Sequence, residues 1–313
     1  MDNVQNIVDM RDAFFDELHH IIAKDKNTVI LTADHGAFGL KKIEEAYPEQ
    51  YINVGIAEQA LISVAAGLAK CGKKVYVYAI NNFVSLRVLE QINIDLCAMN
   101  LDVNIIGVGA GFTYSTDGPT HQGVQDLSAM INLPNLQVYN VTDDISTKKL
   151  AELSYKQSGP KYFRIEKGKL PRIYVDNDDI SIGHKIINER QANNVIISSG
   201  FMTQKIVNVL QSLEQDNINL AHMDIFRINP LPIEDILKFT KNKNVIVVEE
   251  NIKSGGIAEK IFCLLKENNH TKNVLSIALE NKFYFSFGDR EMLHKIANID
   301  ESSIIKKIKS FIH

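Results

Sequence analysis

Residues 52–73, INVGIAEQALISVAAGLAKCGK, and residues 74–80, KVYVYAI, indicate the fold class. The first stretch predicts the end of a strand, a turn at Gly55, and a helix of small residues that stops at Gly72. The second stretch predicts a strand, because it is short and rich in β-branched and aromatic residues. A helix leading directly into a strand with large apolar side chains is typical of α/β proteins.

The same alternation continues on both sides of this stretch. Helices are expected over residues 7–24, 84–100 and 147–156, and strands over residues 28–34, 103–111, 135–141 and 160–167. Buried Val/Ile-rich strands that alternate with helices predict a parallel sheet with helices on both faces. A polar stretch after Pro171, VDNDDIS, is a candidate domain boundary.

The alternation restarts after this boundary. Strands are expected over residues 194–200, 218–225, 244–250 and 273–279, and helices over residues 202–215, 232–241 and 256–268. We therefore expect a second, smaller α/β unit, so the fold class is α/β with two parallel-sheet domains.

Composition narrows the functional classes. The 313 residues carry 34 basic and 38 acidic side chains, a formal charge of −4, which disfavours nucleic-acid binding. The first residues carry acids where a signal peptide would be basic, and no apolar run approaches the ~20 residues of a membrane span. Three widely spaced cysteines fit no metal-ligand pattern. We expect a cytoplasmic protein that binds neither nucleic acid nor membrane and holds no metal through its own residues.

Glu58 is the first candidate for chemistry. It lies three residues after Gly55, where a carboxylate can simply cap a helix and oppose its dipole. The apolar helix that follows it, ALISVAAGLA, also permits a dry setting, in which a carboxyl group can donate a hydrogen bond to a ligand nitrogen.

Residues 107–127, GVGAGFTYSTDGPTHQGVQDL, follow a predicted strand. Phe112 stands where a dinucleotide fingerprint would require its last glycine. We expect a flexible loop, a tight turn at Asp117-Gly118-Pro119, and a helix that opens at Thr120-His121. His121 is then either a surface histidine of the first turn or a polar group in a cleft at the end of a parallel strand.

Other candidates have ordinary structural alternatives. Phe83 fits core packing, Arg87 fits a helix surface, and Asp34 fits a chain reversal at a strand end. Arg11 and Arg164 can each bind a phosphate in bidentate fashion, although isolated arginines are usually solvated or structural.

Taken together, these segments resemble the C-terminal half of transketolase and, nearly as closely, that of 1-deoxyxylulose-5-phosphate synthase. The motifs that carry the resemblance are TADHG, NVGIAEQ, FVSLRVLEQI, DGPTHQGVQDL, LPNLQVY, FRIEKG, SSG-x-M, FRINPLP, VVEEN-x-x-x-GG and FGDRE, in this order. The resemblance implies a thiamine-diphosphate-binding pyrimidine domain over residues 1–175 and a transketolase C-terminal domain over residues 190–313.

The resemblance assigns cofactor contacts. Glu58 matches the catalytic glutamate that shares a proton with the pyrimidine ring nitrogen of thiamine diphosphate. Phe83 matches the aromatic residue that stacks on the pyrimidine. Asp34 and Arg87 complete the expected cofactor-binding set.

The resemblance also assigns substrate contacts. Asp117 and the catalytic His121 match residues that contact the sugar hydroxyls, and Arg11 and Arg164 match arginines that hold the substrate phosphate. Transketolases carry a histidine where this chain has Gly109, and the synthases carry an arginine where it has Ala110. Part of the family's phosphate grip is therefore missing, which leaves open whether the substrate is phosphorylated.

The chain lacks the GDG…N motif with which full-length relatives bind the cofactor's diphosphate through magnesium. We therefore expect a split transketolase, in which a separate subunit supplies the diphosphate-binding half and most of the Mg²⁺ contacts. The family implies a heterotetramer that shares thiamine diphosphate between the two kinds of chain and acts on sugars or sugar phosphates.

Three alternatives stay open. The first is the beta subunit of a 2-oxoacid dehydrogenase-type enzyme, although such chains usually have H-x-S-Q where this one has DGPTHQ. The second is a ligase similar to deoxyxylulose-phosphate synthase. The third is a degenerate, non-catalytic relative that only binds its partner, against which the retained Glu58, Phe83 and His121 argue.

Overall fold

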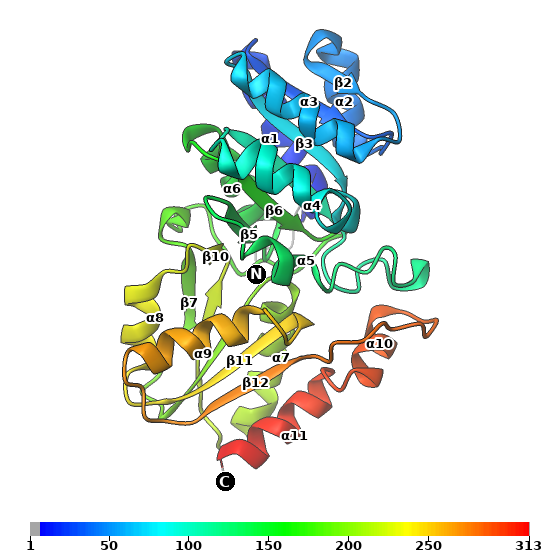
Figure 1. Ribbon diagram of the computed structural model, residues 1–313. Helices are drawn as coiled ribbons and strands as arrows, with labels where there is room; N and C mark the ends of the chain where they lie inside the picture. The colour runs from blue at the N-terminus through cyan, green and yellow to red at the C-terminus, as the bar shows by residue number, and fades with distance from the viewer. Residues whose placement is uncertain (1–6, 313) are drawn as a thin grey trace.

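The computed structural model describes residues 7–312, arranged as two α/β units that stack end to end (Figure 1). The first unit is built on a sheet with the strand order β10-β5-β6-β4-β3-β1-β2. Its strands are β1 (Thr28–Thr32), β2 (Tyr51–Asn53), β3 (Lys74–Ile80), β4 (Val103–Val108), β5 (Gln137–Asn140), β6 (Lys161–Ile165) and β10 (Arg227–Asn229).

Strand β3 shows why this sheet is covered on both faces. Val75 and Val77 point into one apolar core, while Tyr76 and Tyr78 point into the other, and all are at most 2% exposed. Side chains of a strand alternate between faces, so large apolar residues at every position require helices on both sides.

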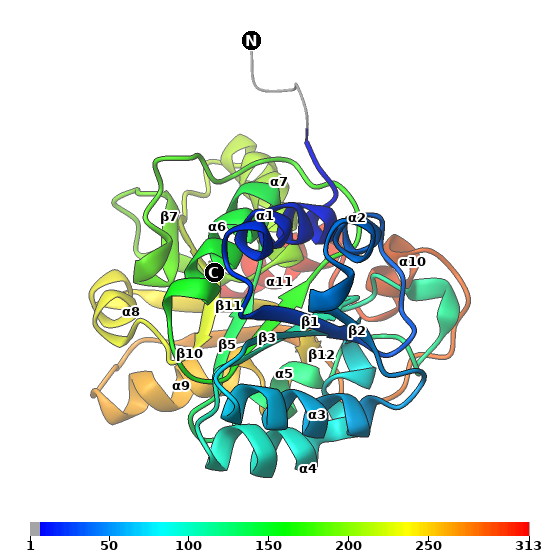
Figure 2. The ribbon, with the colours of Figure 1, turned by 90° about the horizontal axis from the view of Figure 1, so that it is seen from above.

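Helices cover the two faces of this sheet (Figure 2). One layer contains α1 (Met10–Lys24), α2 (Phe38–Ala46) and α6 (Asp144–Lys156). The other layer contains α3 (Glu58–Lys70), α4 (Leu89–Gln91) with a π-helical continuation (Ile92–Ala98), and α5 (Asp126–Met130). The helix expected at residue 7 begins at Met10, where the Asp9 side chain caps it, and the part of the predicted first domain before residue 7 lies outside the described residues.

The second unit has the strand order β12-β11-β8-β9-β7. Its strands are β7 (His184–Asn188), β8 (Asn194–Ser198), β9 (Ala221–Ile225), β11 (Asn244–Ile252) and β12 (Val274–Leu279). Helices α7 (Phe201–Gln215) and α11 (Glu301–Ile312) pack on one face, α8 (Ile233–Thr240) and α9 (Ile257–Glu267) pack on the other, and α10 (Arg290–Ile296) follows β12.

The prediction of purely parallel sheets is wrong at one edge of each sheet. Strand β7 pairs antiparallel with β9, and β10 pairs antiparallel with β5. The pairing of β10 also crosses between the units, because β10 follows β9 in sequence but joins the first sheet. Both strands are short and lie at sheet edges, where neither strand alternation nor apolar content distinguishes the direction of pairing.

A buried polar chain lies between the two units. Asp224 on β9 accepts hydrogen bonds from Thr142 and Tyr174 of the first unit at 2.7 and 2.6 Å, and from Thr203 on α7 at 2.6 Å. Ser198 continues the chain from Thr203 to the Nε2 atom of His222, 2.7 Å away. These contacts satisfy polar groups that would otherwise oppose docking of the two units.

His222 predicts a pH dependence of stability. Burial lowers its pKa to about 3, against 6.5 for the free side chain, so the unfolded chain binds the extra proton between these values. Stability is therefore present above pH 6.5 and is lost as the pH falls toward 3. From pH 7 to pH 5, the free energy of unfolding of the wild type should fall by about 2 kcal/mol relative to His222→Gln.

Urea unfolding of both proteins at the two pH values measures this difference. Burial raises the pKa of Asp224 to about 6, which gives an opposite slope, but Asp224 is present in both proteins and cancels in the comparison. Parallel pH profiles for the two proteins would contradict the prediction.

Candidate functional site

The polar residues of the candidate site gather where the parallel strands β1, β3 and β4 end. Ligands of open α/β sheets bind at this carboxyl edge, because loops there diverge and leave a crevice. The segments that follow the three strands, together with the N-terminus of α3, carry most of the residues predicted from the sequence.

Glu58 is the first residue of α3 and is only 4% exposed. Gly55 has a positive φ of 74°, which turns the chain from β2 into the helix, and Ala57 precedes the helix without a side-chain cap. The Glu58 side chain does not cap its own helix; it accepts a hydrogen bond from Arg87 Nη1 at 2.8 Å. The simple capping alternative for Glu58 is therefore not what the structure shows.

Phe83 lies in the 3₁₀ turn Asn81–Phe83 directly after β3. The Arg87 guanidinium lies 3.9 Å from the centre of its ring, so Arg87 touches both Glu58 and Phe83. His35 and His121 approach the same ring, with centroid separations of 5.7 and 5.2 Å. A buried carboxyl group and a partly exposed aromatic ring thus share one small region.

His35 was not among the residues predicted from the sequence. It follows Asp34 at the end of β1, and burial lowers its pKa, although the Glu58 carboxylate works in the opposite direction. Its Nδ1 atom is buried without a hydrogen-bond partner. The signal that could have found it is its position in TADHG, next to the candidate Asp34.

Asp34 lies on the rim of this region and is exposed. Its φ is +59°, and its backbone N–H donates to Asn53 Oδ1 at 3.0 Å, the atom that also accepts from Gly55 N. Asp34 therefore links the end of β1 to the turn before Glu58.

The expected helix at Thr120-His121 is absent. Residues 115–117 form a 3₁₀ turn, Gly118 has a φ of +75°, and the next helix in the chain, α5, begins only at Asp126. Asn82, next to Phe83, donates from its side chain to the carbonyl oxygens of Thr120 and Gln122, both at 3.1 Å. The segment is thus a turn held from the end of β3, and it places His121 against Phe83.

Asp117 and Arg11 lie around Tyr114, another residue that the sequence did not single out. The Tyr114 ring lies 6.2 Å from that of His121, and burial raises its pKa while Arg11 lowers it and Asp117 raises it. A hollow of about 440 Å³ opens beside Arg11 and the residues after His35. The Nε atom of Arg11 is buried without a hydrogen-bond partner.

Tyr114 also explains Gly109. A Cβ atom on Gly109 would overlap the Tyr114 ring, and the φ of Gly109 is +108°. Ala110, the other position where relatives carry a basic side chain, is fully buried. Neither position has room for a phosphate-binding side chain in this loop conformation.

The prediction that Arg164 holds a substrate phosphate does not fit the structure. Its side chain is 3% exposed and pairs with Asp126, with Nε 2.9 Å from Oδ2. It also donates to Asn140 on β5 and to the backbone oxygen of Glu250 in the second unit. Because its donors are already engaged by buried acceptors, Arg164 has a structural role.

The remaining groups suit an aminopyrimidine ligand. Such a ring needs an aromatic face to stack on and a carboxyl group for a ring nitrogen, and Phe83 and Glu58 supply these two features in contact with the same Arg87 side chain. Within residues 7–312, no cluster of His, Cys, Asp and Glu could hold a metal ion, and no helix is long and apolar enough to cross a membrane.

Comparisons with known proteins agree with this arrangement. The transketolase pyrimidine-binding domain model matches residues 6–172, and the transketolase C-terminal domain model matches residues 184–304. One of the two subunits of the apulose-4-phosphate transketolase from Phocaeicola vulgatus is 28% identical over 98% of both chains. The 1-deoxy-D-xylulose-5-phosphate synthase of Dictyoglomus turgidum is 31% identical over 88% of this chain and 44% of its own.

A solved structure shows the same fold. A split-gene transketolase, in an inactive beta4 tetramer, superposes with a TM-score of 0.86 at 24% identity over 98% of both chains. Since the two family models together span nearly the whole chain, the chain belongs to the transketolase family.

Proposed function

We propose that this chain is one subunit of a split transketolase that transfers a two-carbon ketol unit between sugars or sugar phosphates. The observation that carries the proposal is the buried Glu58 carboxyl beside Phe83 at the carboxyl edge of the sheet. The match to a single transketolase subunit over 98% of both chains supports a partner-dependent enzyme. The partner would be a separate diphosphate-binding subunit, and the assembly a heterotetramer.

The family depends on thiamine diphosphate, which supplies a carbanion that cleaves and forms carbon–carbon bonds next to a carbonyl group. In this chain, Glu58 would hold a proton at the ring nitrogen of the pyrimidine, and Phe83 would stack on that ring. Arg87 orients Glu58 through their hydrogen bond, and Asp34 stands at the turn before it. The partner would supply most of the Mg²⁺ contacts.

Asp117 and His121 would bind the sugar hydroxyls, because their turn lies next to Phe83. Arg11 is the remaining arginine of the predicted phosphate grip, and Lys167 lies 5.5 Å from the Tyr114 ring. These two cations are the candidates for a negatively charged end of the substrate. We also place the protein in the cytoplasm, since free thiols at Cys71 and Cys263 fit a reducing compartment.

Reconstitution tests this function. The chain, its partner subunit, thiamine diphosphate and Mg²⁺ should together transfer ketol units from ketose donors to aldose acceptors, whereas either subunit alone should be inactive. Phosphorylated and unphosphorylated sugars compared in the same assay identify the substrate class. Absence of transfer with all of them would contradict the proposal.

The likeness to deoxyxylulose-phosphate synthase supports a second candidate, a ligase that forms 1-deoxy-D-xylulose 5-phosphate. Formation of that product by the reconstituted pair, without ketol transfer between sugars, would favour the ligase. Oxidative decarboxylation of a 2-oxoacid would instead favour the dehydrogenase alternative.

A further inference from the structure

The loop that carries Tyr114, Asp117 and His121 begins inside the second unit. Phe112 is fully buried, and its ring contacts Tyr284 and His294, with centroid separations of 5.3 and 5.9 Å. Both partners lie beyond β12 in the C-terminal domain. The first residues of the loop are therefore held by a domain that contributes none of the predicted cofactor or substrate contacts.

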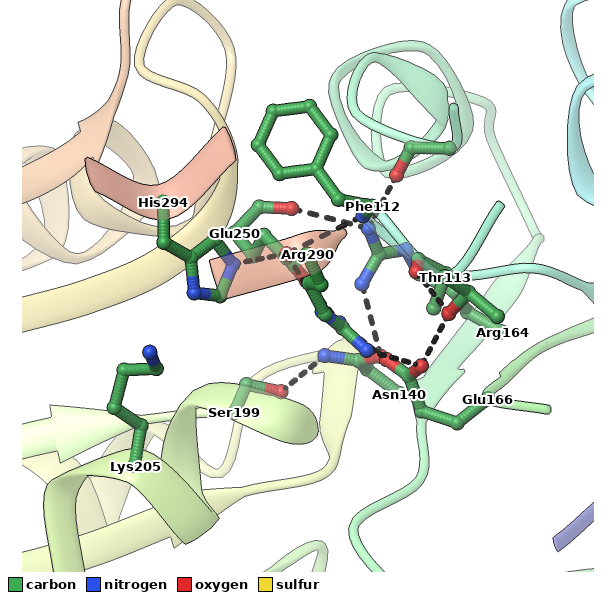
Figure 3. A network of polar contacts seen from close by, with 12 residues as sticks. Phe112, Thr113, Asn140, Arg164, Glu166, Ser199, Lys205, Glu250, Arg290 and His294 are labelled. Carbon is green, nitrogen blue, oxygen red and sulfur yellow. Dashed lines mark hydrogen bonds and ion pairs between the residues drawn. The ribbon is translucent and has the colours of Figure 1, made fainter. Parts of the chain in front are cut away.

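Two buried carboxylates hold this start of the loop (Figure 3). The backbone N–H of Phe112 donates to Glu250 Oε1 at 3.2 Å, and the Thr113 hydroxyl donates to Glu166 Oε2. Glu250 lies on β11, and Glu166 directly follows β6. Consecutive loop residues are thus bound to carboxylates from different domains.

Arg290 joins the two carboxylates. Its Nη1 and Nη2 atoms donate to the two oxygens of Glu166 at 2.8 and 2.9 Å, its Nε donates to Glu250 Oε1 at 2.9 Å, and Nη2 also contacts Glu250 Oε2. His294 Nε2 bonds to Glu250 as well. Burial alone would raise the pKa of Glu250, but Arg290 and His294 outweigh it and hold that pKa well below its ordinary value.

The backbone of the loop is shaped to the Glu250 carboxylate. Gly111 has a φ of +56°, and a Cβ atom there would overlap Glu250 Oε2. Only glycine therefore permits the carboxylate to approach the backbone so closely. A contact that served only to join two domains would not require this fit at the first turn of a substrate loop.

Another interdomain carboxylate offers a contrast. Asp224 also accepts hydrogen bonds from both units, through Thr142, Tyr174 and Thr203, but these partners all lie outside the 109–122 loop. It joins the domains away from the site. The Glu250–Arg290–Glu166 group joins the domains through the loop itself.

We propose that Glu250 and Arg290 are positioning residues of the active site, which fix the start of the 111–121 loop and thereby place Asp117 and His121 for the sugar. The inference rests on the proposed function, since it requires that this loop binds substrate. The C-terminal domain then has a defined task, which is to hold the substrate loop against the pyrimidine domain.

The test compares Glu250→Gln with Tyr174→Phe. Glu250→Gln keeps the size of the side chain but gives it an amide that cannot accept from Arg290, His294 and the Phe112 N–H together. Tyr174→Phe removes one interdomain hydrogen bond to a buried carboxylate away from the loop, and so controls for loss of domain docking alone. Arg290→Lys, which keeps a cation but loses the planar fork, is the conservative third variant.

Two readouts separate positioning from general stability. Hydrogen exchange of the free, full-length chain should become at least tenfold faster in residues 109–122 of Glu250→Gln, less so in Arg290→Lys, and stay unchanged in Tyr174→Phe. In the reconstituted enzyme, Glu250→Gln should raise the KM for sugar at least fivefold, while the Kd for thiamine diphosphate stays within twofold of the wild type.

The outcomes are distinct. Unchanged exchange in residues 109–122, or equal changes in Glu250→Gln and Tyr174→Phe, would overturn the inference, as would a faster-exchanging loop with an unchanged KM. If Glu250→Gln does not fold, the same measurements on Arg290→Lys decide the question. A wild-type complex that transfers no ketol unit at all would instead contradict the proposed function.

Discussion

Replacing Glu58 by alanine is expected to lower the kcat of the assembled enzyme by about 10²–10⁴-fold, the usual contribution of a positioned acid or base. The carboxyl group is 4% exposed, yet it pairs with Arg87, whose side chain is 44% exposed. Water can therefore satisfy Arg87 once Glu58 is gone. The loss should appear in turnover far more than in the stability of the chain.

Glu90→Ala is the matched control for this prediction. Glu90 lies three residues after Arg87 on the same segment and is exposed, so its removal changes the charge equally without touching the site. Steady-state transfer assays give kcat, and thermal unfolding of the isolated chain reports its stability. Full turnover by Glu58→Ala would contradict the assignment of Glu58 and, with it, the proposed site.

Replacing Arg164 by methionine is expected to lower the free energy of unfolding by about 3–5 kcal/mol, because removal of one partner leaves a buried charge uncompensated. Asp126 is fully buried, and it also accepts hydrogen bonds from Asn81 and Tyr162, but Arg164 is the cation paired with it. Arg164 additionally reaches backbone oxygens of Gly123 and Glu250. Its loss therefore disturbs both domains.

Arg190→Met provides the comparison. Arg190 pairs with Glu214 at 2.7 Å on the surface, where the two side chains are 40% and 39% exposed. Exposed pairs contribute about 0–1 kcal/mol. Urea unfolding of the two variants should show this difference. A stable Arg164→Met protein with a raised KM for phosphorylated sugars would return Arg164 to the substrate site.

The contrast between Arg11 and Arg164 shows where sequence motifs stop being informative. Both residues are candidates because arginine binds phosphate well, and both match arginines of the family. Arg11 keeps a buried Nε without a partner beside a hollow, whereas the donors of Arg164 are used by buried acceptors. A motif specifies which donors are present, but only packing decides whether they remain available.

The sequence by itself determined the α/β class, the order of nearly all parallel strands along the chain and the identity of the candidate residues that follow them. This was possible because apolar alternation and helical periodicity are local properties, and because loops after parallel strands must meet at one edge. Strand β3 carries this information in seven residues, with valines for one core and tyrosines for the other.

Only the tertiary structure decided the antiparallel edges, the turn that replaces the expected helix at His121, and the contact of Gly111 with Glu250. Each depends on groups far apart in the chain: β10 pairs with β5, Asn82 holds the turn at residues 120–122, and Glu250 lies 139 residues after Gly111. Long-range contacts of this kind leave no periodic trace in the sequence, because each requires only one residue at the right place in space.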